Sequence, residues 1–381
     1  MPVRVAIIGA GPMGIAAALG ALDRGCDVTV FDRGAAGDSP RSWGPARFFS
    51  PLRMNVSACM RELLGDELPD ENALLTGPEF ADAILSPLVA RAPLRDRVKE
   101  RHNVVAVARR GLTRCDYAGH PLRAERPFVL FVDGPSGEQT VEADVVLDAT
   151  GAFTIPRPFG AGGLPARGEL ALQRPPIRTL GALYTQRDAV RGKRVLLVGH
   201  GHSAANALAM LEEAGANVTW AIRSAHRRPC EEIANDPLPE RQRIVENANA
   251  LAESPPPWLT VERRAMIESV SENGAFDVRL TGGRTASVDA IAAFTGYRPD
   301  SRHIQELAVE ISPVTEGGAR LYRAISNITD CLSVPKVRAE DLQSGEPNFF
   351  FIGARSYGRA RTFLLQSGLA QLETILEGLS R

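Results

Sequence analysis

Three glycines near the N-terminus have the spacing that lets a protein backbone hold a pyrophosphate. Gly9, Gly11 and Gly14 follow an apolar, β-branched run and precede an Ala/Leu-rich stretch, which places them at a strand-to-helix turn. There the first glycine permits the tight bend, the second lets the phosphates approach, and the third lets the helix pack on the strand. Pro12 and Met13 complete the segment. We therefore predict a dinucleotide site; a glycine-rich turn without a ligand is the alternative.

An acidic residue stands where the next apolar run ends. Asp32 lies 18 residues after Gly14, follows the β-branched run 28–31, and precedes Arg33. A carboxylate at this place can accept hydrogen bonds from ribose hydroxyls. The order strand, turn, helix, strand, acid is the context that gives the glycine pattern its meaning. We expect FAD or NAD at this first site.

The same pattern recurs 190 residues later. Arg194 aligns with Arg4, and Gly199, Gly201 and Ala204 take the three glycine positions with no gap between the copies. The third position tolerates alanine. A chain with two such units is built to hold two dinucleotides, or one dinucleotide and the relic of a second site. His202 and Ser203 complete the second turn.

The second copy differs from the first in its charge. Ile222 stands where the first copy has Asp32, and Arg223 follows, with Arg227 and Arg228 close behind. Loss of the acid and gain of arginine suit a 2′-phosphate, so we predict NADP(H) at this second site. A solvated basic loop is the alternative.

Composition is that of an ordinary globular enzyme. The chain has 381 residues, 44% of them hydrophobic and 23% charged, and 44 Lys and Arg against 45 Asp and Glu give a net charge of −1. This balance does not favour nucleic acid or a membrane surface as a partner. The five scattered cysteines form no Cys-x-x-Cys pattern, so we expect no disulfide scaffold and no metal site. We infer a reducing, cytoplasmic setting, with a homodimer as one option.

Regular elements alternate along the chain as in an α/β protein. Buried parallel strands are expected at 145–147 and 348–352, with a hairpin at 128–143 and a last helix from Thr362, its expected N-cap, to Leu379. Trp43 lies in a long loop, where it lines a flavin ring or forms a small core with its aromatic neighbours. Two Thr-Gly turns, at Gly151 and Gly296, suggest where the chain crosses between domains.

Taken together, these motifs resemble the flavoproteins with two dinucleotide-binding domains, which include flavin-containing monooxygenases and thioredoxin reductase-like enzymes. The resemblance covers essentially the whole chain and implies an α/β fold, an FAD-binding Rossmann-like domain with an inserted Rossmann-like NADPH-binding domain. The implied boundaries are 1–184 and 295–381 for the FAD domain and 185–294 for the insertion. The resemblance implies that Gly9, Gly11, Met13, Gly14 and Asp32 hold FAD, with Val104 touching the adenine, and that Gly199, Gly201, Ser203, Ala204 and Arg223 hold NADPH. We also expect Pro12, Arg33, Trp43, Gly151 and Gly353 at the FAD site and His202 and Arg227 at the NADPH site.

Three activities remain open for such a chain. The resemblance favours an NADPH-consuming monooxygenase that uses molecular oxygen and a peroxyflavin to oxygenate a small molecule at nitrogen, sulfur or a ketone. Arg47, Asn55 and Gln366 are the polar residues expected near its pocket. The second reading is a reductase or oxidase acting on a thiol, disulfide or quinone, with Cys59 as the candidate thiol. The third is a redox-sensing module that holds nucleotides without turnover. Gly353-Ala354-Arg355 replaces the Gly-Asp that is usual in the reductases.

Overall fold

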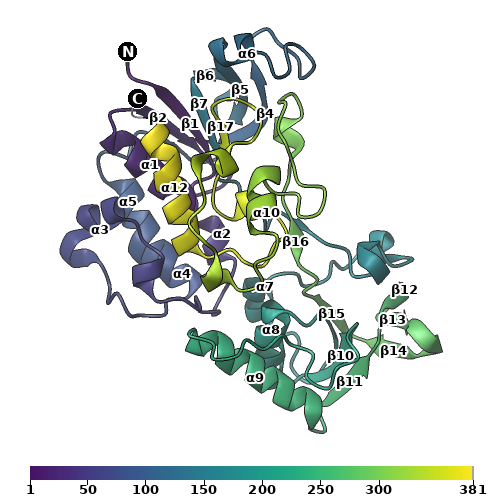
Figure 1. Ribbon diagram of the computed structural model, residues 1–381. Coiled ribbons are helices and arrows are strands. Elements are labelled where there is room, and N and C mark those ends of the chain that lie inside the picture. The colour runs from purple at the N-terminus through teal and green to yellow at the C-terminus, as the bar shows by residue number, and fades with distance from the viewer. Residues whose placement is uncertain (380–381) are drawn as a thin grey trace.

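The computed structural model describes residues 1–379 and shows two lobes, each built on its own parallel sheet (Figure 1). The first lobe contains a five-stranded sheet whose inner strands are apolar and buried on both faces, as parallel strands between helices are. Its strands, in order across the sheet, are β17 (Phe349–Phe351), β7 (Val145–Asp148), β1 (Arg4–Ile8), β2 (Asp27–Phe31) and β3 (Val98–Lys99).

Two helices lie side by side on one face of this sheet, although they come from opposite ends of the sequence (Figure 1). They are α1 (Pro12–Asp23) and α12 (Leu365–Leu379). Apolar side chains of both are buried in one core, and Arg24 Nη2 donates to Glu373 Oε2 at 2.8 Å beside it. The prediction that the last helix begins at Thr362 was wrong, because 362–364 run without helical structure and α12 begins at Leu365.

A second sheet of the first lobe is antiparallel and consists of β4, β5 and β6. The predicted hairpin is present, with a two-residue turn between β5 and β6. Buried Glu346 accepts from Arg109 Nε at 2.9 Å and from Arg123 Nε at 2.8 Å, which ties this sheet to the C-terminal part of the chain. The bounds are β4 (Asn103–Arg109), β5 (Phe128–Gly134), β6 (Gly137–Ala143), α2 (Asp38–Arg41), α3 (Ala58–Leu64), α4 (Gly77–Phe80), α5 (Ser86–Ala90) and α6 (Leu122–Glu125).

The second lobe repeats the start of the first. Its strand β9 (Arg194–Val198), helix α8 (His202–Glu213) and strand β10 (Asn217–Ile222) each begin 190 residues after β1, α1 and β2. The internal repeat is therefore confirmed element by element. The four-stranded parallel sheet has the order β11 (Leu259–Arg263), β10, β9 and β15 (Ala290–Ala293), and α9 (Pro239–Glu253) packs beside α8.

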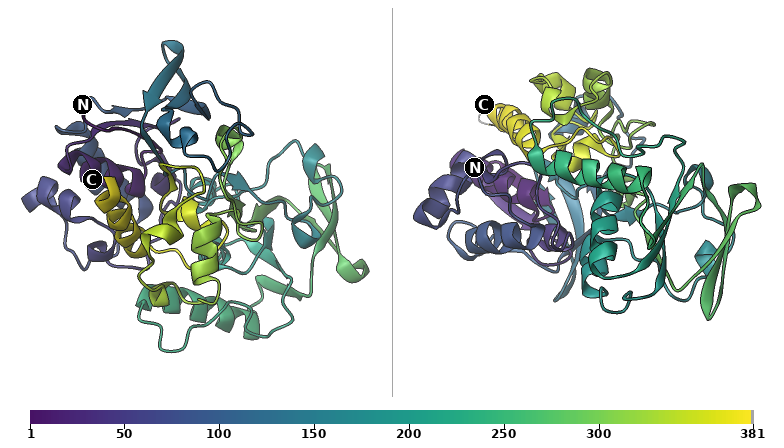
Figure 2. Two further views of the ribbon diagram at one scale, coloured as in Figure 1. Left: turned by 45° about the horizontal axis from the view of Figure 1, so that its top comes forward. Right: turned by 90° about the horizontal axis from the view of Figure 1, so that it is seen from below.

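A three-stranded antiparallel sheet extends from this second lobe, as Figure 2 shows. Its strand β12 was not expected, because the polar run Ile267–Asn273 carries a weak strand signal. The chain crosses between the lobes where Ile155–Pro156 pairs antiparallel with Tyr297–Arg298. The remaining bounds are β12 (Ile267–Asn273), β13 (Ala275–Leu280), β14 (Thr285–Val288), β8 (Ile155–Pro156), β16 (Tyr297–Arg298), α7 (Leu180–Thr185), α10 (Ala319–Ile325) and α11 (Ala354–Tyr357).

The domain boundaries at 184/185 and 294/295 stay predictions. Within residues 1–379, no helix combines the length and the apolar character needed to cross a bilayer.

Candidate active site

The first glycine turn has the geometry that its spacing predicts. Gly9 has φ of 109°, a left-handed conformation, and a Cβ there would lie 2.7 Å from the carbonyl oxygen of Ala149. A Cβ at Gly14 would lie 1.8 Å from the carbonyl oxygen of Gly9. Side chains at these two positions would collide with backbone, so both glycines are required by the fold itself.

Gly11 is different, because it faces space rather than protein. A Cβ at Gly11 would have no described atom within 4 Å. Gly11 precedes α1, and the N–H groups of Met13 and Gly14 in the first helical turn find no hydrogen-bond partner among residues 1–379. Free N–H groups at a helix N-terminus beside a bare backbone attract an anion. The residues present therefore fit a dinucleotide pyrophosphate.

Asp32 lies beside this turn and is held rigidly. Its Oδ2 accepts from Ala10 N at 2.7 Å and its Oδ1 from Gly34 N at 2.8 Å. Burial raises the pKa of Asp32, although these two N–H donors oppose the shift. The segment before β4 runs alongside, since His102 N donates to Asp32 O at 2.7 Å, and Val104 is buried two residues further on. Arg33 is exposed.

The second glycine turn has the same construction. Gly199 has φ of 113°, and a Cβ there would lie 2.4 Å from the carbonyl oxygen of Phe294. Trp220 Nε1 donates to Gly199 O at 2.6 Å, a contact without a counterpart in the first copy that the sequence did not suggest. A Cβ at Gly201 would again meet no described atom within 4 Å. In the described chain the N–H groups of His202, Ser203 and Ala204 also have no partner, so this turn fits a second pyrophosphate.

The arginines in the basic loop after β10 differ in whether they form ion pairs. Arg223 and Arg227 are exposed, and neither forms an ion pair with any described residue. Arg228 is engaged, since its Nε donates to Glu232 Oε1 at 2.7 Å and its Nη1 to Glu253 Oε2 at 2.6 Å. The side chain of Ile222 is buried in the core rather than facing the loop. Of the three arginines, Arg223 and Arg227 are the ones free to meet a phosphate.

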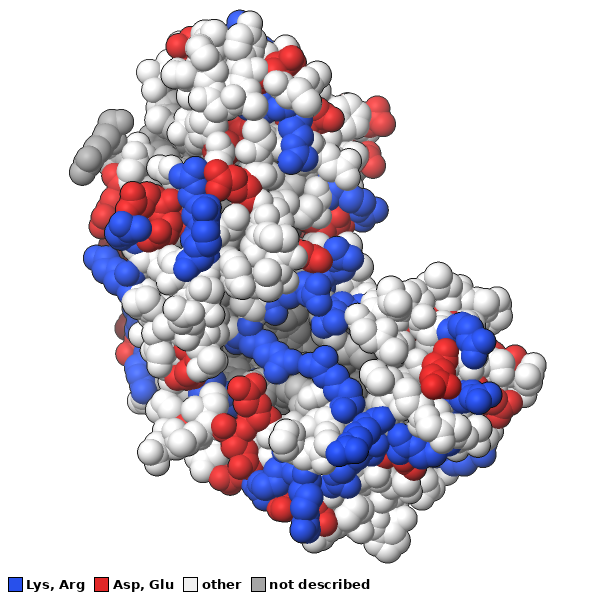
Figure 3. Space-filling view, turned by 45° about the vertical axis from the view of Figure 1, so that its right-hand side comes forward, with Lys and Arg blue, Asp and Glu red and all other residues white. Residues whose placement is uncertain are grey.

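Positive charge also comes to the second turn from the first lobe. Figure 3 shows Lys and Arg side chains gathered along the hollow between the lobes. Burial lowers the pKa of His200, and the charges of Arg223 and Arg361 lower it further. Arg157 is half-buried, and its pKa is lowered by burial and by neighbouring arginines, with Arg359 the first of them. This hollow suits an anionic ligand.

A buried charge network lies at the ends of β7 and β17. Asp148 Oδ2 accepts from Arg355 Nε at 3.1 Å and lies 3.2 Å from His303 Nε2, while Oδ1 accepts from Thr150 Oγ1 at 2.6 Å. Burial alone would raise the pKa of Asp148, but His303 and Arg355 outweigh it and hold this pKa well below its usual range. The sequence did not lead us to predict this network, although an acidic residue directly after the apolar run 145–147 could have indicated a functional or structural carboxylate there.

Of the other residues expected at the FAD site, Gly353 lies against the first glycine turn. Gly151 has φ of 77°, and a Cβ there would meet no described atom within 4 Å. Gly353 has φ of 63°, and a Cβ there would lie 2.5 Å from Met13 Cγ, so the turn after β17 packs against the start of α1. Trp43 is half-buried between Phe48 and Phe153, with ring centroids 5.0 and 6.4 Å away, and it packs on the core of the first lobe.

The three polar residues expected near the pocket do not come together. Arg47 is exposed, and its Nη1 donates to Leu74 O at 2.6 Å. Asn55 is buried, and its amide donates to Ser50 O at 3.0 Å, which shapes its own loop. Gln366 is exposed in the first turn of α12. A catalytic role for these residues stays a prediction.

Comparison with known proteins identifies a matching family and similar solved structures. The pyridine nucleotide-disulphide oxidoreductase family matches residues 3–337. Bacillithiol disulfide reductase from Bacillus cereus has a similar structure, with a TM-score of 0.69 and 19% identity over 100% of this chain and 99% of that one. Ornithine N-hydroxylase from Kutzneria sp. 744 has a TM-score of 0.64 and 15% identity, and the match covers 100% of this chain and 98% of that one. Thioredoxin reductase from T. acidophilum has a TM-score of 0.63 and 16% identity, and the match covers 99% of this chain and 98% of that one. A search among curated proteins gave no match. The expected fold is confirmed.

Proposed function

Because the chain belongs to the pyridine nucleotide-disulphide oxidoreductase family, we propose that it is an NADPH-consuming flavoprotein monooxygenase acting on a small molecule. Its membership confirms the expected cofactors, FAD and NAD(P)H, and an FAD-dependent oxidoreductase activity. When bound, FAD supplies hydride chemistry between the nicotinamide and an electron acceptor. The finer question is which acceptor takes the electrons.

The cysteines favour an acceptor that diffuses in. All five are free, and none is paired with another. Cys59 lies in α3, near Asp23 at the C-terminal end of α1, so the length of that helix, about 18 Å, separates it from the glycine turn. Burial raises the pKa of Cys59, and it raises the pKa of Cys230 to about 11, which keeps both thiols protonated and poorly nucleophilic.

A cavity lined mainly by residues of the first lobe supports the proposal of a small-molecule substrate. A cavity of about 330 Å³ lies beside α11, the helix that follows Gly353. Ser356 Oγ donates to Gly353 O at 2.7 Å, so one wall of the cavity is bonded to the turn that packs on Met13. A volume of this size suits a small molecule and not a second protein.

The overall reaction balances without a further reductant. NADPH provides two electrons and one proton, the solvent provides a second proton, and molecular oxygen provides both oxygen atoms. One oxygen atom joins a nitrogen, sulfur or ketone substrate and the other leaves as water. The protein's part is to hold both nucleotides by their phosphates and to keep water from the reacting centre.

Coupling of NADPH to product tests this proposal. The FAD-loaded protein is incubated with NADPH, oxygen and trimethylamine, L-methionine or cyclohexanone, while NADPH, oxygen, hydrogen peroxide and product are measured. We expect one of these classes to lower peroxide formation and to yield product in a one-to-one ratio to NADPH.

A disulfide or quinone reductase is the second candidate. The family description and the similarity to bacillithiol disulfide reductase favour it. With oxygen removed, rapid NADPH oxidation on addition of a disulfide or menadione would replace the monooxygenase proposal with this one.

A further inference from the structure

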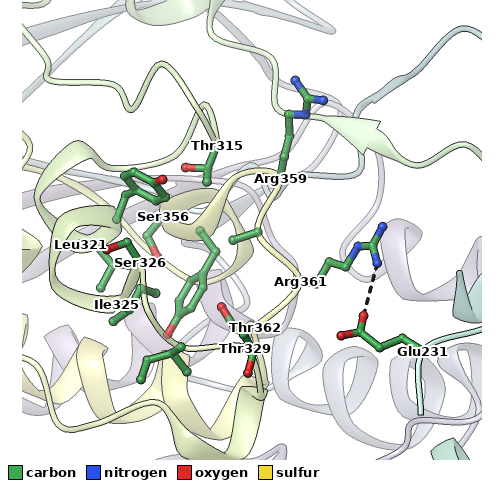
Figure 4. A pocket seen from close by; sticks show the side chains of 14 residues that line it. Glu231, Thr315, Leu321, Ile325, Ser326, Thr329, Ser356, Arg359, Arg361 and Thr362 are labelled. Carbon is green, nitrogen blue, oxygen red and sulfur yellow. Dashed lines mark ion pairs between the residues drawn. The ribbon is translucent and has the colours of Figure 1, made fainter. Parts of the chain in front are cut away.

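The cavity beside α11 is contributed by both lobes. Its walls come from α10 and from the segment 356–362, which belong to the first lobe, and from Glu231, which follows β10 in the second lobe (Figure 4). Its volume of about 330 Å³ is at the lower end of the range for small-molecule sites.

One side of the cavity is apolar. Leu321 and Ile325 of α10 are buried there, with Ile328 and the ring of Tyr357 beside them. Tyr357 packs against Phe363 at 5.2 Å between ring centroids, and a Cβ at Gly368 would lie 2.8 Å from Phe363 and 3.1 Å from Met13 Sδ. Two rings therefore separate this apolar side from the start of α1.

Thr362 adds a hydroxyl group to the same cavity. The residue is only 7% exposed and lines the cavity, and its side chain forms no hydrogen bond with any residue that the structure describes. Its oxygen retains some accessible surface, so the hydroxyl is open to a ligand in the cavity. Thr362 lies in the segment 362–364, which precedes α12 without helical structure.

The other side of the cavity carries opposite charges. Figure 4 shows Arg361 and Glu231 facing each other there, away from Leu321 and Ile325. Their Nη1 and Oε2 atoms are 3.6 Å apart, and both side chains are more than two-thirds exposed. Such a long, exposed ion pair contributes little to stability, and both side chains can rotate to take other partners. Arg359, beside them, holds Glu316 only at 3.5 Å.

We propose that this cavity binds an α-amino acid with an apolar side chain, its carboxylate on Arg361, its ammonium on Glu231 and its side chain against Leu321 and Ile325. A zwitterion matches both charges at the mouth, whereas a plain acid or amine satisfies one and leaves the other. The inference deepens the proposed function, because it names the substrate class. It can be tested by binding alone, without turnover.

Three probes of one chain length separate the contributions. L-norleucine carries both charges, hexanoate lacks the ammonium, and hexylamine lacks the carboxylate. Isothermal titration calorimetry on the FAD-loaded full chain should show L-norleucine binding at least about tenfold more tightly than either, the size of one charge-assisted hydrogen bond.

The variants should remove one contribution each. Glu231→Gln should make the affinity for L-norleucine equal to that for hexanoate. Arg361→Gln should make the affinity for L-norleucine equal to that for hexylamine. Arg191→Gln, which opens the exposed pair with Asp188, is the matched control and should change neither ratio. Circular dichroism and the thermal unfolding midpoint of Glu231→Gln, compared with those of Arg191→Gln, show whether the variant is folded.

Several outcomes would overturn the inference. Hexanoate binding as tightly as L-norleucine would make this a site for simple anions. No binding of any probe would remove the cavity as a site. A rise in the KM for NADPH in Arg361→Gln with unchanged L-norleucine affinity would assign that arginine to the nucleotide phosphates. L-norleucine binding as expected, with no oxygenated product from the thioether amino acid L-methionine, would support this inference while refuting the monooxygenase proposal.

Discussion

Arg355 Nε lies 3.1 Å from Asp148 Oδ2, and neither side chain is exposed to solvent. Asp148 ends β7 and Arg355 follows β17, so the pair joins the ends of two neighbouring strands. Thr150 bonds to the same carboxylate, which fixes the turn that leads to Gly151. The sequence Gly353-Ala354-Arg355 thus supplies a structural cation directed into the protein.

Removing this cation should destabilise the first lobe. We expect Arg355→Met to lower the free energy of unfolding by about 3–5 kcal/mol, because it leaves a buried carboxylate with His303 and Thr150 as its remaining side-chain partners. Urea unfolding followed by circular dichroism measures this change. The double variant Asp148→Asn/Arg355→Met should recover part of it. A single-variant loss below about 1 kcal/mol would show that the pair is not needed.

The carboxylate of Asp148 also predicts how the stability of the protein depends on pH. The pKa of Asp148 is lower in the folded protein than in the unfolded chain, where it is about 3.9. Its contribution to stability is therefore complete above about pH 4 and is lost as the pH falls towards the folded-state pKa. Unfolding free energies measured from pH 6 downward should decline more steeply in the parent protein than in Asp148→Asn. Parallel curves would contradict this prediction.

The two open glycines should separate the two cofactors. Gly11→Val places a branched side chain where the first pyrophosphate approaches, so the protein should purify without flavin. Gly201→Val makes the same change at the second turn and should keep its flavin while NADPH binds at least about tenfold more weakly. Visible absorbance of the purified proteins and stopped-flow flavin reduction check these results. Full flavin content in Gly11→Val would contradict the assignment.

The arginines after β10 should differ in their effect on nucleotide choice. Arg223→Ala removes a free guanidinium and should lower the preference for NADPH over NADH by about 10- to 150-fold, which corresponds to about 1.5–3 kcal/mol. Arg228→Ala removes a guanidinium already bound to Glu232 and Glu253, so the preference should not change. Rates of flavin reduction with each nucleotide measure the ratio. Equal use of both nucleotides by the parent protein would refute the prediction.

Loss of the candidate thiol should leave catalysis intact. Cys59→Ala removes a half-buried side chain on α3, at the opposite end of α1 from the glycine turn. We expect the rate of NADPH oxidation to remain within about twofold of the parent, a change below about 0.5 kcal/mol. A fall in this rate of tenfold or more, with flavin content unchanged, would support the alternative hypothesis that Cys59 is a catalytic thiol.

The sequence predicted the parts of the fold that depend on local chemistry. Gly9 and Gly199 both have a left-handed conformation, and a Cβ at either would collide with the carbonyl oxygen of the residue that follows another strand. Their place between a β-branched run and an Ala-rich run implies such a tight turn. The 190-residue repeat could also be predicted, since the first strand and the helix have the same lengths in the two copies and the second strand is only one residue longer in the second copy.

Long-range pairing of polar groups could not be predicted in the same way. Asp148 and Arg355 are 207 residues apart, and nothing in either local pattern selects the other. Arg228 looked equivalent to Arg223 because the sequence does not show which arginine Glu253 will engage. Thr362 was expected to cap the last helix, whereas it lies three residues before α12 and lines a cavity to which distant parts of the chain also contribute.

The short ribbon formed by Ile155–Pro156 and Tyr297–Arg298 has a consequence for how this chain can be rebuilt. The chain leaves the first lobe and returns to it at neighbouring points, so the second lobe is a cassette with adjacent ends. A short linker from Pro156 to Tyr297 closes the first lobe on itself without disturbing a strand of its five-stranded sheet. Nicotinamide-binding modules with other nucleotide preferences could be grafted at the same junction.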